Sequence, residues 1–211
     1  MISLIHPSRG RPEQSFANAT EWLSKAGNVD VEIIVTVDTT DPKLGIYQHL
    51  YGSQAYAFDH TSVVHATNNG ASMAKGDILI YLSDDFKCPN KWGELVVKEF
   101  EGEKRPLMLK VDDALQKFHV TILTIPIMNR SLYEKLGYMW HPAYKSMHVD
   151  VDLFYTCQKL GAIKNCPHLV FEHHHPANGK AQNDETYTRS AANWNQGLDI
   201  LNRRKKQGFP V

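Results

Sequence analysis

The chain contains the stretch Asp77-Ile78-Leu79-Ile80-Tyr81-Leu82-Ser83-Asp84-Asp85. Its apolar run predicts a buried strand that brings two adjacent carboxylates, Asp84 and Asp85, to its carboxyl end. Ligand sites of open α/β sheets lie outside the carboxyl ends of the strands. Carboxylate oxygens suit Mg²⁺ and Mn²⁺, so this stretch is a candidate site for a divalent cation held against phosphates. The alternative is a strand that simply ends in an acidic turn before Pro89.

Strands and helices alternate through the first half of the chain. Apolar runs predict strands over residues 2–5, 31–37, 77–82, 107–111, 118–125 and 168–171. Helical spacing and helix-ending glycines predict helices over residues 16–26, 68–75, 89–100, 131–136, 150–160 and 185–206, the last with Trp194, Leu198 and Leu201 on one face. Residues 39–62 show no clear period and are expected to be irregular. The alternation predicts an α/β fold with a mostly parallel central sheet, helices on both faces and a C-terminal helix.

Length and composition fit one soluble domain. The 211 residues include 23 basic and 23 acidic side chains, so no overall field favours nucleic acid or a membrane surface. No apolar run reaches the roughly 18 residues of a membrane span. The three cysteines match no zinc spacing, which predicts reduced thiols and a cytoplasmic location. We expect a single domain over residues 1–211, with a nucleotide-binding half over about 1–110 and an acceptor half over about 111–211.

Two further strand ends carry polar side chains. The first strand leads into Pro7-Ser8-Arg9-Gly10-Arg11-Pro12, where Arg9 and Arg11 offer planar donors for phosphate or base. The loop has neither the dinucleotide-binding glycine pattern nor a P-loop. Asp38 ends the second strand and is suited to a ribose hydroxyl or a base N–H, or else to capping a turn. The segment Asn68-Asn69-Gly70 is by itself typical of a turn.

Two segments in the second half carry acids and histidines. In His148-Val149-Asp150-Val151-Asp152 two carboxylates stand at the start of a predicted helix. Capping explains one of them, and the other is a candidate general base. The segment Glu172-His173-His174-His175-Pro176 follows the last predicted strand. Imidazoles at a strand end are candidate ligands for Mn²⁺, although a histidine cluster is also common in exposed polar loops.

In this order, the segments resemble the family-2 glycosyltransferases, whose catalytic domain has the GT-A fold. The resemblance covers roughly residues 1–175. It matches residues 7–12 to a Pro-x-Arg-type loop and Asp38 to an aspartate that contacts the nucleotide base. It also matches Asn68-Asn69-Gly70 and Ala74-Lys75-Gly76-Asp77 to an Asn-x-Gly segment and an Ala-x-Gly-Asp turn. The donor-binding residues that it implies are Pro7, Ser8, Arg9, Arg11, Asp38, Asn69, Lys75, Ser83 and Asp84.

The resemblance also implies a metal site and a catalytic base. The family's Asp-x-Asp motif falls on residues 83–85, with Ser83 in place of the first aspartate. Asp85 is then the metal-bridging carboxylate, while Asp84 contacts ribose or supports the loop. A histidine of the 173–175 cluster completes the metal site, and alternation along a strand favours His173 or His175. The family's Glu-Asp motif aligns with Val149-Asp150, which makes Asp150 the general base and Asp152 the second candidate.

These expectations amount to a metal-dependent, inverting glycosyltransferase, either a hexosyl- or a pentosyltransferase. It would use Mn²⁺ or Mg²⁺ and move a sugar from a nucleoside-diphosphate sugar, with a UDP-sugar favoured, to an acceptor hydroxyl. A saccharide, a lipid-linked precursor, a protein and a modified DNA base all remain open as acceptors. One rival is a nucleotidyltransferase, although the glycine-rich phosphate loop with a following lysine is missing. The other rival is a non-catalytic nucleotide-sugar-binding module, which the replaced acids at Ser83 and Val149 favour.

Overall fold

A central sheet of seven strands, in the order β3-β2-β1-β4-β7-β6-β8, forms the middle layer of the computed structural model, which describes residues 1–118, 120–182 and 185–211. Strand β7 runs antiparallel to both neighbours and every other pair in this sheet is parallel, which confirms the mostly parallel sheet. Strands β5 and β9 form a separate two-stranded sheet. The bounds are β1 Ile2–Pro7, β2 Val31–Asp38, β3 Ala55–Phe58, β4 Ile78–Tyr81, β5 Phe86–Lys87, β6 Met108–Asp112, β7 Ile127–Asn129, β8 Ile163–Val170 and β9 Glu172–His173.

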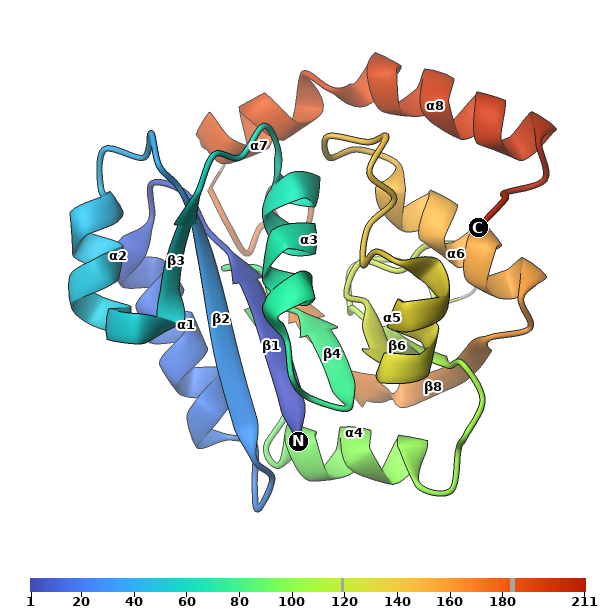
Figure 1. The fold of residues 1–211 in the computed structure, drawn as a ribbon, viewed down its shortest axis with the longest axis horizontal. Helices are drawn as coiled ribbons and strands as arrows, with labels where there is room; N and C mark the ends of the chain where they lie inside the picture. The colour runs from blue at the N-terminus through green and yellow to red at the C-terminus, as the bar shows by residue number, and fades with distance from the viewer. Residues whose placement is uncertain (119, 183–184) are drawn as a thin grey trace.

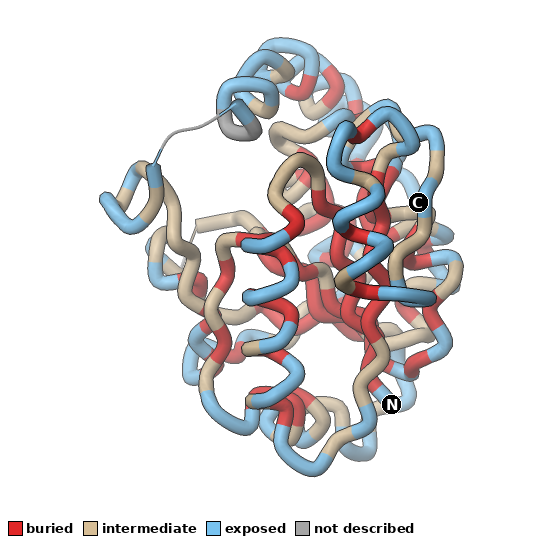
Figure 2. Tube along the Cα trace, turned by 90° about the vertical axis from the view of Figure 1, so that its left-hand side faces the viewer, coloured by how far each residue is buried: buried red, intermediate tan, exposed pale blue. Residues whose placement is uncertain are grey.

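Helices cover both faces of the sheet, and each face has its own core (Figure 1). Strand β1 alternates between the two cores, with Leu4 in one and Ile5 in the other. Figure 2 shows this buried material between exposed helix surfaces. The first face carries α1 (Pro12–Ser24), α2 (Leu44–Tyr51) and α4 (Trp92–Phe100), and the second carries α3 (Val63–Met73), α5 (Arg130–Leu136) and α6 (Val149–Lys159).

The carboxyl ends of the parallel strands share one edge of the sheet, because β1, β2, β3, β4, β6 and β8 run in the same direction. In Figure 1 this edge is at the top, and the N-terminus lies at the bottom. Helices α7 (Glu185–Ala191) and α8 (Trp194–Lys206) cross above it, while the short helices η1 and η2 span Gly52–Gln54 and Pro176–Asn178. No described helix is both long and apolar enough to cross a membrane.

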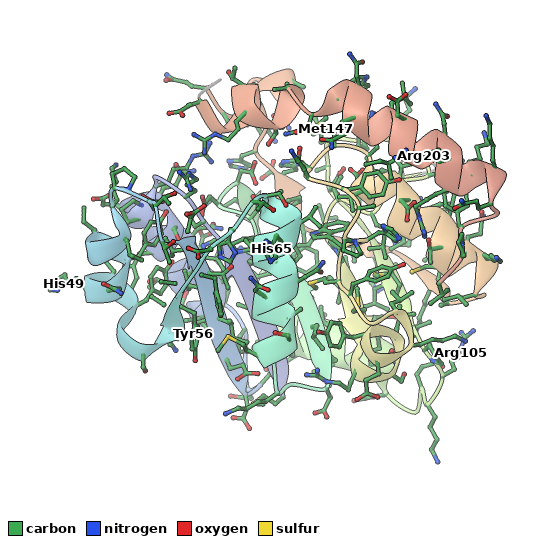
Figure 3. The ribbon with its side chains drawn as sticks, turned by 45° about the horizontal axis from the view of Figure 1, so that its top comes forward. His49, Tyr56, His65, Arg105, Met147 and Arg203 are labelled. Atoms are coloured by element: carbon green, nitrogen blue, oxygen red, sulfur yellow. The ribbon has the colours of Figure 1, made fainter. Side chains whose placement is uncertain are left out.

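The single C-terminal helix predicted for residues 185–206 is wrong, because the chain breaks between α7 and α8. Trp194, Leu198 and Leu201 all lie in α8, but Trp194 is 50% exposed and Leu198 is 37% exposed, and of the three Leu201 packs against the second core. Helix α8 instead buries Gly197, Ile200 and Arg204. A Cβ at Gly197 would collide with the carbonyl oxygen of Met147, which Figure 3 labels beneath α8. The break therefore turns α8 so that its glycine can lie against this loop.

Residues 39–62 are not irregular, which corrects the prediction. They hold α2, η1 and β3. Helix α2 buries only Tyr47 and Tyr51, and β3 is an edge strand with one partner, β2. Elements that bury so little carry a weak hydrophobic period, which is the signal that pattern reading requires.

The strand predicted over residues 118–125 is also wrong for the residues that are described there, and His119 lies outside them. Both edges of β6 are already occupied by β7 and β8, so this segment cannot pair with β6. The segment instead bonds locally and to α6. The Val120 amide donates to Lys117 O at 2.9 Å, and the Leu123 amide donates to Asp150 O at 3.3 Å. Leu123 and Ile125 are nevertheless buried.

The segment Asn68-Asn69-Gly70 lies inside α3, so it is neither a turn nor the segment that precedes a helix. Asn68 accepts from the Met139 amide and the Trp140 amide, both at 3.0 Å, and so ties α3 to the loop after α5. A Cβ at Gly70 would come within 2.8 Å of the Ile5 side chain. The glycine therefore lets α3 pack closely on β1.

Candidate functional site

A pocket of about 550 Å³ opens at the carboxyl edge of the sheet. It is lined by every predicted donor-binding residue except Asn69 and Lys75, and by Asp85. The lining comes from the loops after β1, β2 and β4, which lie side by side because these strands are neighbours in the sheet. Strand ends that are far apart in the sequence thus line one concave surface. It lies where the ligand crevice of an open α/β sheet is expected.

Asp38 ends β2 in a network of hydrogen bonds. Its Oδ2 lies 2.7 Å from Arg9 Nη1, and its Oδ1 accepts from the Thr40 amide at 2.8 Å and the Thr40 hydroxyl at 2.7 Å. Burial acts to raise the pKa of Asp38, but the bonds from Thr40 and the charge of Arg9 hold the pKa below its ordinary value. Asp38 is therefore a fixed anion at this end of the pocket.

The loop of residues 7–12 is held by two residues that the sequence reading did not select. The Gly10 amide donates to Asp41 Oδ2 at 2.7 Å, and the Arg11 amide donates to the Tyr47 hydroxyl at 3.0 Å. Gly10 has a φ of 72°, in the left-handed region that favours glycine. Both anchors lie in residues 39–62, where no element was expected, so no sequence signal pointed to them.

Asp84 points inward and supports this loop. The Ser8 hydroxyl lies 3.1 Å from Asp84 Oδ2, and His6 Nε2 lies 3.2 Å from Asp84 Oδ1. The Arg11 guanidinium is 3.9 Å away. Asp84 is 9% exposed, so its carboxylate joins the ends of β1 and β4 rather than facing open solvent. Of the two predicted roles, this geometry favours loop support.

Asp85 lies against His173. Its Oδ2 is 3.3 Å from His173 Nε2, although the two residues are 88 positions apart. The small sheet explains the pairing, because Phe86 of β5 lies opposite His173 of β9 and the His174 amide donates to Asp85 O at 2.8 Å. The His173 ring also stacks on Phe86, with centroids 4.3 Å apart. The predicted juxtaposition of Asp85 and a histidine is therefore present.

His175 lies nearby and also has a structural task. Its ring centroid is 5.1 Å from that of His173, and its Nδ1 accepts from the Ala177 amide at 3.1 Å at the start of η2. Burial, with a further contribution from His173, lowers the pKa of His175, so its imidazole is neutral at neutral pH. His173, which faces Asp85 directly, is the better placed of the two predicted histidine ligands.

Asp85 and His173 fit a divalent cation that substrate completes. Adjacent ligands of an octahedral ion with metal–oxygen distances of about 2.1 Å are about 3 Å apart, close to the 3.3 Å between Asp85 Oδ2 and His173 Nε2. Within residues 1–118, 120–182 and 185–211, no three His, Cys, Asp or Glu side chains converge as a metal site. Such ions are commonly bound by one or two protein ligands together with phosphates and water, so a two-residue site suits them.

Asp150 lies in the first turn of α6 and is half-buried. Burial raises its pKa to about 6, the charge of Asp113 adds to the rise, and a hydrogen bond from the Val151 amide and the charge of His173 oppose it. The charges of Asp85 and Asp150 both reach the Tyr81 hydroxyl, whose pKa is raised chiefly by burial. Asp150 is thus a carboxylate with increased proton affinity that lies within electrostatic range of His173.

Asp152 is fully buried on the other side of this turn. The Arg204 Nε lies 2.6 Å from its Oδ2, the Tyr144 hydroxyl donates to it at 3.0 Å, and the Thr156 hydroxyl donates at 3.3 Å. This carboxylate joins α6 to α8 and has no exposed surface for an acceptor. The second candidate for the general base is therefore structural, because its oxygens are occupied.

Asn69 and Lys75 are the predicted donor contacts that the pocket does not include. Asn69 lies behind the lining, with its Nδ2 3.4 Å from Nδ1 of His60, which does line the pocket. The Lys75 amide donates to Glu32, and Lys75 directly precedes the amino end of β4. Lys75 is at the opposite edge of the sheet from the pocket, which excludes it from the donor-binding set.

The fold of this chain is similar to that of several solved glycosyltransferase structures. Residues 1–349 of S. aureus TarS in complex with UDP-GlcNAc superpose with a TM-score of 0.57 at 15% identity, covering 90% of this chain and 64% of that chain. The mannosyltransferase PcManGT from Pyrobaculum calidifontis, in complex with GDP-Man and Mn²⁺, gives a TM-score of 0.66 at 14% identity, covering 85% of this chain and 58% of that chain. This is a GT-A-like glycosyltransferase fold.

The GT-A-like fold confirms the predicted fold class, and at these identities the likeness is one of fold. This chain spans less than two thirds of the length of these neighbours. No family model matches the sequence. No curated protein matches it either. The roles of individual residues therefore depend on the geometry above.

Three basic residues that line the pocket of this GT-A-like fold were missed by the sequence reading. His60 follows β3, Lys145 precedes α6, and Arg189 lies in α7. None belongs to a motif, and each reaches the pocket only through packing between elements far apart in the chain. The sole hint in the sequence is that Lys145 and Arg189 flank segments rich in polar and aromatic residues, which is too common to select them.

Proposed function

We propose that this chain transfers a glycosyl group from a nucleoside-diphosphate sugar to an acceptor hydroxyl, with inversion at the anomeric carbon. One observation carries the proposal: Asp85 and His173 lie 3.3 Å apart at the same strand edge as the Arg9–Asp38 pair, and the charge of His173 acts on the half-buried Asp150. The ligands of the structural neighbours, UDP-GlcNAc in TarS and GDP-Man with Mn²⁺ in PcManGT, support a nucleotide-sugar donor.

The donor lies across the pocket. Asp38 and Arg9 bind the nucleoside end of the donor. The loop of residues 7–12 lines the pocket along the rest of the donor as far as Asp85, and Ser83 and Asp84 line it too. Because Asp38 is a fixed anion, it accepts hydrogen bonds from ribose hydroxyls or a base N–H. A uracil N3–H is one such donor, so a UDP-sugar is the first donor to test.

Asp85 and His173 are the residues that hold a divalent cation, Mn²⁺ or Mg²⁺. When bound, this ion would neutralise the charge that develops on the leaving diphosphate. Such neutralisation lowers the free energy of the transition state by several kcal/mol. The chain itself contributes the placement of the two ligands, which the β5–β9 pairing sets.

Asp150 acts as the general base. The acceptor oxygen forms a bond to the anomeric carbon while the bond from that carbon to the diphosphate oxygen breaks, and the acceptor proton passes to the Asp150 carboxylate. A pKa of about 6 leaves this group mostly ionised at pH 7 yet more basic than an ordinary aspartate, which suits proton abstraction. A base on the face opposite the leaving group gives inversion. The acceptor classes left open above share this hydroxyl.

A donor screen tests the proposal directly. The thermal stability of the protein is measured with UDP-, GDP-, CMP- and TDP-sugars, with and without Mn²⁺, and the stabilising donor is then assayed for release of its nucleoside diphosphate. A ligand at 100 times its Kd stabilises the fold by about 2.7 kcal/mol. We expect one nucleotide series to stabilise in a Mn²⁺-dependent manner and to be turned over.

The control pair is Asp38→Asn and Asp30→Asn, which lie at the two ends of β2. Asp38→Asn removes the stabilisation by donor, and Asp30→Asn keeps it because Asp30 is exposed at the far edge. Stabilisation without any turnover identifies a non-catalytic binding module, and no response to any donor rejects the proposal.

A further inference from the structure

The pocket has two walls that differ in origin. The first wall consists of the strand-end loops described above. The second wall consists of Lys145 and Ser146, before α6, together with Arg189, Ser190 and Asn193 of the α7–α8 segment. Figure 1 shows α7 and α8 passing over the carboxyl edge of the sheet, which is why they complete the pocket from the opposite side.

The charges of the first wall are already balanced. Arg9 lies 2.7 Å from Asp38, and Arg11 lies 3.9 Å from Asp84. Asp85 lies against His173. An incoming diphosphate therefore finds few uncommitted cations on this side.

The second wall carries two cations without a matching acid in the pocket. In the described part of the chain, Lys145 forms no hydrogen bond or ion pair, and it is exposed. Arg189 pairs with Glu185 on its own helix, where the two side chains are 54% and 84% exposed. A solvent-exposed pair of this kind contributes little, so the Arg189 guanidinium can exchange its partner at small cost.

The segments that carry these cations are joined to each other. The Ser146 hydroxyl donates to Ser190 O at 3.2 Å. The rings of His148 and Trp194 meet with centroids 4.4 Å apart, and Gly197 of α8 lies against Met147. The loop before α6 and the α7–α8 segment therefore form one wall, and Lys145 and Arg189 hold a defined position across from the strand ends.

We propose that Lys145 and Arg189 bind the diphosphate of the donor and stabilise it as it leaves. The inference rests on the proposed function and assigns it two further residues. When the bond between the anomeric carbon and the diphosphate oxygen breaks, its electron pair moves onto that oxygen, which gains one negative charge. Cations at this position bind the transition state more tightly than the ground state. Arginine suits phosphate because its planar fork donates two hydrogen bonds, and lysine adds a point charge.

A ladder of ligands tests the pair. The affinities of uridine, UMP and UDP, or of the series that the donor screen selects, are measured for wild type and for the double variant Lys145→Gln with Arg189→Gln. The matched control is Arg203→Gln with Lys205→Gln, which makes the same charge change on the exposed face of α8. We expect the double variant to lose about tenfold or more in UDP affinity, as for lost hydrogen bonds between charged groups.

The loss of affinity should be confined to ligands that carry the diphosphate. Uridine affinity stays unchanged in the double variant, the value of kcat falls, and the salt dependence of UDP binding weakens. Equal UDP affinity in the double variant and the control overturns the inference while leaving the proposed function intact. Failure of wild type to bind any nucleoside diphosphate or its sugar rejects the proposed function instead, so the two failures are distinguishable.

Discussion

The turn after β4 and the first turn of α6 each present two carboxylates, and in both places the two members differ. Asp84 is committed to the chain, bonded to Ser8 and close to His6. Its neighbour Asp85 lies at the pocket against a histidine. Asp84 thus supports the loop of residues 7–12, and Asp85 is the carboxylate that we propose as a metal ligand.

The first turn of α6 repeats this division with different partners. Asp152 is fully buried and paired with Arg204, while Asp150 is half-buried and has its pKa raised to about 6. The oxygens of the carboxylate paired with arginine are occupied, whereas burial without a cationic partner raises the affinity of a carboxylate for a proton. The lesson is that neighbouring acids in a motif need not share a function, and burial separates them.

The largest expected effect is on turnover in Asp150→Asn. Loss of a general base reduces kcat by about 10²- to 10⁴-fold in comparable cases. Donor affinity should stay within about twofold, because Asp150 does not line the donor pocket. Steady-state kinetics together with donor titration measure both quantities. Equal turnover in the variant would remove Asp150 from the mechanism.

The pH dependence of the same variant sharpens this result. The folded-state pKa of Asp150 is raised from its model-peptide value of 3.8 to about 6. The folded state therefore binds this proton more tightly than the unfolded state, so the contribution of Asp150 to stability improves as pH falls from about 6 toward about 4. Over the same range the kcat of wild type should decline as the base is protonated. In Asp150→Asn, both the gain in stability and the decline in kcat that Asp150 causes over this pH range should be absent. The control is Asp199→Asn on the exposed side of α8, which should keep both.

Asp152→Asn should change kcat less than Asp150→Asn does, but it should lower the free energy of unfolding more. Removing one partner of a buried ion pair costs about 3–5 kcal/mol, because Arg204 is left without its counter-charge. Urea unfolding measures the loss, and kcat per folded molecule should stay close to wild type. The double variant Asp152→Leu with Arg204→Met should regain part of the stability. A selective loss of turnover in a fully stable Asp152→Asn would contradict the division between the two acids.

Much of the fold and the first wall of the site followed from the sequence. Parallel strands share an edge, so Asp38, Asp84 and Asp85 at successive strand ends had to meet there. Histidine ligation was less determined, since three histidines were candidates. The β5–β9 register places His173 opposite Phe86, which brings His173 against Asp85 and is why we propose His173. Local pattern thus located the edge, and a long-range pairing of two short strands placed one histidine at Asp85.

The second wall was beyond local pattern. Arg189 and Lys145 reach the pocket only because α8 docks against the loop before α6, with Gly197 fitted to Met147. The Arg204–Asp152 pair, which joins residues 52 positions apart, also connects α8 to α6. A single helix over residues 185–206 was predicted because periodicity does not reveal where a helix must turn to pack.

The comparison of Asp84 with Asp85 provides the most direct test of a metal-dependent donor site. Free Mn²⁺ is titrated by electron paramagnetic resonance in the presence of UDP against wild type, Asp84→Asn and Asp85→Asn. We predict that wild type and Asp84→Asn take up Mn²⁺ with UDP, and that Asp85→Asn does not. Uptake by Asp85→Asn equal to that of wild type would contradict the assignment of the metal to Asp85 and His173.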